Sequence, residues 1–123
     1  MLSLIVEGWN DYHRIREVYP DLDILVTGGT KINNRLRRSI AYRLERGKLI
    51  YILSDPDEAG DQLVTMIKSE YPTLTRIEVN KESACYFTGK RMRYGVEYMD
   101  NNSIKELLGE IICAHVETIN DLE

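Results

Sequence analysis

One stretch near the middle of the chain limits the possible folds more than any other. The five apolar residues of Leu49–Leu53 run into two carboxylates on either side of a proline, Asp55-Pro56-Asp57. Such a run is typical of a short strand that is buried on both faces, as in a parallel sheet. Pro56 has no N–H and a fixed φ angle, so it ends the strand and favours the start of a helix. Both carboxylates therefore lie at the carboxyl end of a parallel strand, the edge at which open α/β sheets bind their ligands.

A second short apolar strand, Leu4–Val6, ends in the same way. Glu7 and Gly8 follow it directly, and Asp11 comes shortly after. Acids at the ends of two parallel strands can meet at one point, where they repel each other unless a cation joins them. Carboxylate oxygens are the hard ligands that Mg²⁺ prefers, and Mn²⁺ is the alternative ion. We therefore predict a divalent metal site at this edge.

These segments together resemble the Toprim (topoisomerase-primase) family, and within it the ribonuclease M-five type, the maturase of 5S ribosomal RNA. The resemblance extends to Glu97 and rests on Ile5–Gly8, Thr27–Gly29, Asp55–Asp57 with Gly60, and Gly95–Glu97. It implies a Rossmann-like α/β fold with a central four-stranded parallel sheet flanked by helices. It also implies that the strands before Glu7 and Asp55 are neighbours in that sheet.

The resemblance further implies a Mg²⁺-dependent nuclease that hydrolyses phosphodiester bonds in structured RNA. Asp55 and Asp57 would hold the metal, and Glu7 would complete its shell or move a proton. Asp11 matches the last residue of the family's E-G-x-x-D motif and is a further candidate metal ligand. Its alternative role is that of an acid in the first turn of a helix. The residues expected to support the site are Gly8, Gly28, Gly29, Gly60 and Glu97.

The chain departs from the ribonuclease M-five pattern in three respects. Trp9 stands where that type usually has a basic residue, and Tyr98 where it tends to have histidine. Loss of a cation near the metal weakens phosphate contact, although an indole can stack on a base. The full maturase has a further domain that engages its ribosomal RNA–protein substrate, and the chain ends before that domain. A partner protein that supplies this part is therefore one expectation, and the substrate does not carry over with the fold.

The net charge of −4 argues against a general nucleic-acid binder, but the charges are segregated along the chain. A helix is predicted over residues 32–46, with Ile32, Leu36, Ile40 and Leu44 on its inner face. A long, basic, aromatic-rich loop is predicted over residues 80–97. The candidate nucleic-acid-binding residues are Lys31, Arg35, Arg38 and Arg46 around the helix and Lys90, Arg91 and Arg93 in the loop. A solvated helix face and a loop that covers the core are the plain alternatives.

The other predicted elements complete an alternating β/α order. Strands are expected over residues 23–27 and 76–79, and helices from Asn10 or Asp11 to Tyr19 and from Pro56 or Asp57 to Tyr71. A capping box at Ser103–Glu106 predicts a C-terminal amphipathic helix. Its apolar stripe holds Ile104, Leu107, Leu108, Ile111, His115 and Ile119. We expect a single Toprim domain over residues 1–123, with the core and basic loop in 1–97 and the helix in 98–123.

Composition bears on where in the cell the protein is expected. No apolar run approaches the roughly 20 residues of a membrane span, and the short opening run is interrupted by Glu7, so no signal peptide is expected. Cys85 and Cys113 lack metal-ligand spacing, which favours reduced, buried thiols and a cytoplasmic location. His13 is expected on the surface.

Three other functions are compatible with parts of the pattern. A non-catalytic Toprim-like module would use the arginine face to bind RNA or an acidic protein. A DNA-cleaving nuclease would share the whole site. A phospho-receiver-like switch also has acids at strand ends, but it places its acidic pair after the first strand, and here the distribution is reversed.

Overall fold

The computed structural model describes residues 2–29 and 31–122, with side chains as far as Cys113. Four parallel strands form a sheet in the order β2-β1-β3-β4. They are β1 (Leu2–Val6), β2 (Asp23–Val26), β3 (Leu49–Leu53) and β4 (Thr75–Ile77). The predicted parallel sheet is confirmed. Because β1 pairs directly with β3, the segments that follow these two strands leave the sheet side by side.

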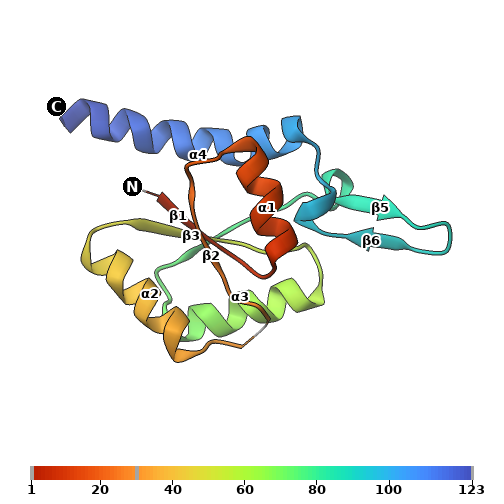
Figure 1. Ribbon diagram of the computed structural model, residues 1–123, viewed down its shortest axis with the longest axis horizontal. Coiled ribbons are helices and arrows are strands. Elements are labelled where there is room, and N and C mark those ends of the chain that lie inside the picture. Colours follow the sequence, from red (N-terminus) through yellow and green to blue (C-terminus); the bar gives the residue numbers. More distant parts are fainter. Residues whose placement is uncertain (1, 30, 123) are drawn as a thin grey trace.

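Helices cover both faces of the sheet, as predicted. They are α1 (Trp9–Val18), α2 (Asn34–Glu45), α3 (Glu58–Glu70) and α4 (Asn101–Leu122). Figure 1 shows α1 and α4 on one side of the strands and α2 and α3 on the other. The side chains of β1 alternate accordingly: Leu4 packs with Ile15 and Leu108 on the first face, and Ile5 packs with the α2 and α3 cluster on the second. This two-residue alternation is what a strand buried on both faces requires.

The C-terminal helix packs on the sheet through its first turns. Ile104 and Leu108 are fully buried, and Leu107 and Ile111 pack against the same cluster. His115 and Ile119, predicted on this stripe, lie outside the residues whose side chains are described. No helix in the described part of the chain is both long and apolar enough to span a bilayer.

Several local predictions are wrong. Helix α1 is capped by Gly8 rather than by Asn10 or Asp11, and α4 begins at Asn101, where the Asp100 carboxylate accepts the Ser103 N–H at 2.7 Å in place of a Ser103 capping box. Leu44 is 39% exposed: it lies in the last turn of α2, and only Leu36 and Ile40 of that helix are buried. Neither thiol is buried: Cys85 is half-buried and Cys113 is exposed.

The segment predicted as a long loop contains a β-hairpin. Its strands are β5 (Cys85–Phe87) and β6 (Met92–Tyr94), paired antiparallel and flanked by 3₁₀ turns at Lys81–Ser83 and Val96–Tyr98. Gly89 adopts a φ of 95° in the connecting turn, a conformation that favours glycine. Figure 1 shows the hairpin projecting from the body of the molecule. Strands of three residues have too little alternation to be recognised, which explains the error.

An ionic contact ties β2 to β1 and α2. The Asp23 carboxylate accepts hydrogen bonds from Ser3 Oγ at 2.6 Å and from Arg43 Nε and Nη2 at 2.6 and 3.0 Å. Lys48 Nζ lies 3.7 Å away. The Arg43 hydrogen bond is the largest cause that lowers the pKa of Asp23 to about 2. Ser3 is buried at the paired position on β1, so this polar pair is satisfied inside the sheet.

The Asp23→Asn variant should be less stable at neutral pH. The folded-state pKa lies below the unfolded value of about 3.9, so the ionised pair stabilises the protein above that pH and the gain is lost as the pH falls towards 2. Solvent screening of this partly exposed group reduces the gain to about 1 kcal/mol. Urea unfolding should show that deficit at pH 7 and a narrowing gap below pH 4. A variant as stable as the wild type at pH 7 would contradict the assignment.

Candidate functional site

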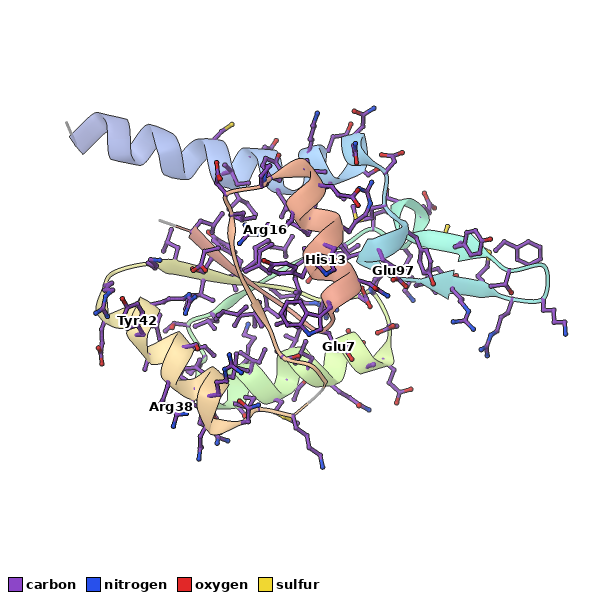
Figure 2. The ribbon with its side chains drawn as sticks, in the orientation of Figure 1. Glu7, His13, Arg16, Arg38, Tyr42 and Glu97 are labelled. Atoms are coloured by element: carbon purple, nitrogen blue, oxygen red, sulfur yellow. The ribbon has the colours of Figure 1, made fainter. Side chains whose placement is uncertain are left out.

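Five carboxylates line one cleft of about 550 Å³ at the carboxyl ends of β1 and β3. They are Glu7, Asp11, Asp55, Asp57 and Glu97, and the predicted supporting residues Gly8, Gly28 and Gly29 line the same cleft. In Figure 2, Glu7 and Glu97 lie near the N-terminal end of α1, one below it and one beside it. The structure thus brings together the four candidate metal ligands and Glu97, although their chemical roles stay predictions.

Backbone N–H groups orient both carboxylates of the Asp55-Pro56-Asp57 segment. Asp55 Oδ1 accepts the Val96 N–H at 2.8 Å, a bond that joins the end of β3 to the turn after the hairpin. Asp57 is the N-cap of α3, and its Oδ1 accepts the Gly60 N–H at 2.7 Å. Each bond uses one of the two oxygens of its carboxylate. Both side chains are therefore held in place by a bond that leaves their second oxygen unused.

The loop after β2 supports Glu7 through its backbone. The Gly28 N–H donates to the Glu7 carbonyl at 2.8 Å, and Gly28 has a φ of 75°. Thr27 Oγ1 donates to the Gly29 carbonyl at 2.6 Å and braces the same turn. A residue with a side chain at position 28 would be strained in this conformation. The glycines predicted as a site element therefore position the end of β1.

Asp11 combines the two roles weighed for it. It is only 7% exposed, and its Oδ2 accepts the Gly8 N–H at 3.3 Å at the start of α1. It also lines the cleft beside Asp55. The side chain is therefore an acid of the first helical turn and a member of the acidic cluster at once.

Burial and mutual repulsion raise the pKa of three acids in the cleft. Burial is the largest cause in each case: it raises the pKa of Asp11 to about 7, helped by the charge of Asp55, and that of Asp55 to about 6, helped by Asp57 and opposed by the Val96 hydrogen bond. The pKa of Glu7 is also raised, by burial and then by Asp57. A cation placed among these oxygens would relieve the repulsion.

The donors suit a hard divalent ion but do not enclose one. Within the described residues, no three acidic, histidine or cysteine side chains form a ready-made metal site. Mg²⁺ is commonly held by one or two carboxylates, while waters and substrate phosphates fill its other positions. Part of the acidic set could therefore hold such an ion, and Asp55, Asp57, Glu7 and Asp11 stay candidate ligands.

The seven predicted nucleic-acid-binding residues are all exposed but do not share one surface. Arg35 lies in the first turn of α2 and lines a hollow that adjoins the cleft. Figure 2 shows Arg38 and Tyr42 on α2, away from Glu7 near the start of α1. Arg46, just past the end of that helix, donates to the Tyr42 carbonyl and stacks 3.4 Å from the centre of its ring. Lys31 lies before α2. Lys90, Arg91 and Arg93 lie on the hairpin.

Two contacts to Asp55 were not predicted from the sequence. One is the Val96 N–H, because a backbone donor leaves no trace in a side-chain pattern; only the neighbouring Glu97 drew attention. The other is Arg76 of β4, whose Nη2 donates to the Asp55 carbonyl at 3.4 Å while Nη1 pairs with Asp61 at 2.7 Å. An arginine in a short edge strand carries no sequence signal for this role.

The fold is that of a Toprim domain. The small TOPRIM domain protein from Bacillus stearothermophilus matches with a TM-score of 0.69, covering 89% of this chain and 86% of that one at 23% identity. In sequence, the chain is similar to ribonuclease M5 from Staphylococcus aureus, with 28% identity over 120 residues, and to ribonuclease M5 from Bacillus anthracis, with 27% identity over 108 residues. These alignments cover 98% and 88% of this chain.

The alignments cover 65% and 56% of the two relatives, so the chain spans less than two thirds of their length. No family model matches the chain. The predicted resemblance is confirmed at this level: the chain has the fold of a Toprim domain and is similar in sequence to ribonuclease M5.

Proposed function

We propose that this protein is a divalent-metal-dependent nuclease that hydrolyses phosphodiester bonds in structured RNA. The observation that carries the proposal is the cleft that gathers Glu7, Asp55 and Asp57 at the ends of two adjacent parallel strands. Similarity to relatives named ribonuclease M5 favours RNA as the substrate. The identity of that RNA, and of any protein that helps to bind it, belongs to the proposal as well.

The acidic residues would divide the work in the cleft. Asp55 and Asp57 would hold Mg²⁺ or Mn²⁺, which supplies Lewis-acid polarisation of a phosphoryl oxygen when bound. Glu7 would bind the same ion or transfer a proton. Backbone hydrogen bonds from Val96 and Gly60 keep the two aspartates oriented before substrate arrives, which limits the reorganisation needed for reaction.

Basic side chains beside the cleft and on the hairpin would offset the repulsion of phosphate by the acids. Arg35 adjoins it on the α2 side, and Lys90, Arg91 and Arg93 are exposed on the hairpin that follows β4. Such side chains attract the nucleic-acid backbone without reading its sequence. Arg35 would then contact substrate beside the cleft, and the hairpin residues would contact a more distant part of it.

The proposal is tested by metal-dependent cleavage. Purified protein is incubated with end-labelled structured RNA, and in parallel with DNA of the same sequence, in Mg²⁺, in Mn²⁺ and in EDTA. We expect RNA cleavage with either metal, none in EDTA, and recovery when excess Mg²⁺ is returned. Faster cleavage of DNA than of RNA would indicate the alternative function, a DNA-cleaving nuclease. Cleavage that persists in EDTA, or none with metal although RNA binds, would contradict the proposal.

A non-catalytic RNA-binding module is the second candidate. It is favoured by the exposed arginines of α2. In that case RNA affinity should fall with salt and on charge reversal of Arg35 and Arg38, while Asp55→Asn should leave it unchanged. Loss of cleavage in Asp55→Asn with RNA binding retained would favour the nuclease.

A further inference from the structure

Trp9 occupies a boundary between two hollows. It is the first residue of α1, two positions after Glu7, and it is 61% exposed. It lines the acidic cleft and also a second hollow of about 380 Å³, formed by the end of β2 and the first turns of α2. Gly28 is the other residue that lines both. The two hollows therefore adjoin, with the indole at their shared edge.

The indole is braced from the helix side. The Tyr12 ring meets it edge-on, with the ring centres 5.1 Å apart at 69°, and His13 lies 6.2 Å away. Tyr12 is itself half-buried and packs against the core cluster beneath α1, with the Arg16 guanidinium 5.2 Å from its ring centre. These contacts restrict the Trp9 ring while most of its surface faces solvent. The indole is thus a large aromatic surface that is both exposed and fixed in orientation.

The two sides of Trp9 offer different chemistry to a nucleic-acid strand. On one side are the carboxylates proposed to act on a phosphodiester. On the other, the second hollow is lined by Asn33, Arg35 and Ser39, which can donate to or charge-pair with a phosphate. Unstacked bases of a nucleic acid commonly pack on exposed aromatic rings that lie beside the groups contacting its backbone.

We propose that Trp9 is a base-stacking residue: an unpaired nucleotide beside the scissile phosphate stacks on the indole, and its neighbouring phosphate lies in the hollow with Arg35. The proposal rests on the proposed function and names its substrate class, RNA with an unpaired base next to the cleavage site. A fully paired helix keeps its bases stacked inside the duplex and would not reach the ring. Removing the ring should weaken binding of such RNA about tenfold or more.

The chain contains a single tryptophan, so its fluorescence reports on this ring alone. The probe is an end-labelled RNA hairpin with one bulged nucleotide, compared with the same RNA made abasic at the bulge and with a fully paired duplex. Titrations in Ca²⁺, with the RNA checked to be intact, follow tryptophan fluorescence and label anisotropy together. We expect saturable quenching by the bulged RNA over the range in which it binds, and little quenching by the abasic RNA or the duplex.

Variants separate stacking from a structural role. Trp9→Ala should bind the bulged RNA about tenfold more weakly, and Trp9→Phe within about threefold of the wild type. Thermal unfolding of both variants controls for a role of the ring in α1. RNA that binds without changing the fluorescence, and binds Trp9→Ala as tightly as the wild type, would overturn the proposal; continued Mg²⁺-dependent cleavage would then leave the nuclease assignment standing. Absence of both binding and cleavage would overturn both.

Discussion

The Asp55→Asn variant is expected to lose about a thousandfold in cleavage rate while it stays folded. Asp55 lies two residues after the end of β3 and lines the cleft with Asp57 and Asp11. Removing its charge removes a leading ligand of the proposed ion, whose electrostatic stabilisation of the reacting phosphate is worth several kcal/mol. A loss of about 4 kcal/mol in the barrier corresponds to that factor in rate.

The same substitution should not harm the fold. Asparagine keeps an oxygen that can accept the Val96 N–H, the bond that Asp55 Oδ1 makes at 2.8 Å. In the metal-free protein the folded-state pKa of Asp55 is about 6, above its unfolded value, so the ionised carboxylate lowers stability at higher pH. The neutral amide removes that penalty. In EDTA at pH 8, the melting temperature of the variant should equal or exceed that of the wild type.

Asp21→Asn is the matched control for the charge change. Asp21 is exposed in the turn before β2, outside the residues that line the cleft. Initial cleavage rates in Mg²⁺ and thermal melts in EDTA are measured for the wild type and both variants. We expect Asp21→Asn to cleave like the wild type. If Asp55→Asn cleaved within threefold of the wild type, Asp55 would have no part in the chemistry.

The Gly60→Ala variant should be strongly destabilised. A Cβ atom at position 60 would lie 2.0 Å from the Asp55 carbonyl oxygen and 3.0 Å from its carbon. Both are backbone atoms, so the start of α3 must move away from the end of β3. That shift would also strain the Asp57 cap on the Gly60 N–H. We expect a loss of about 3 kcal/mol, comparable with severe overpacking, and a fall in melting temperature of roughly 10 °C.

Gly109→Ala provides the matched comparison, because Gly109 also lies within a helix. Its added Cβ would come no closer than 3.8 Å to the Tyr19 hydroxyl. Alanine favours helix over glycine by up to about 1 kcal/mol, so this variant should be as stable as the wild type or more so. Urea unfolding of the two variants checks the difference. Equal stability of Gly60→Ala and the wild type would mean that α3 does not approach β3 as the structure has it.

Most of the fold was predicted from the apolar residues that are buried on the two faces of the sheet. The apolar runs before Glu7 and Asp55 identified β1 and β3, and Pro56 and the acids after it marked the turn into α3. The pairing of β1 with β3 came from the family resemblance, because strand order depends on contacts that local sequence does not encode. Convergence of the acids in one cleft then follows from that order.

Predictions failed where a few residues or the tertiary contacts decided the outcome. The hairpin strands have three residues each and expose Tyr86, Phe87 and Met92, so no alternation of buried and exposed residues marks them. The ion pairs of α2 were not predicted either: Arg37 pairs with Glu70 at 2.9 Å and Arg43 with Asp23 at 2.6 Å. The partner acids lie far away in the sequence, so no local pattern marks these pairs.

Binding of Mn²⁺ to the RNA-free protein tests most directly whether the acids after β1 and β3 share one cation. Calorimetric titrations compare the wild type with Glu7→Gln, Asp55→Asn and the exposed control Asp21→Asn. We predict saturable binding by the wild type and the control, and at least tenfold weaker binding by each of the two cleft variants. Wild-type affinity in Asp55→Asn and Glu7→Gln, or no saturable binding by the wild type, would contradict a shared metal site.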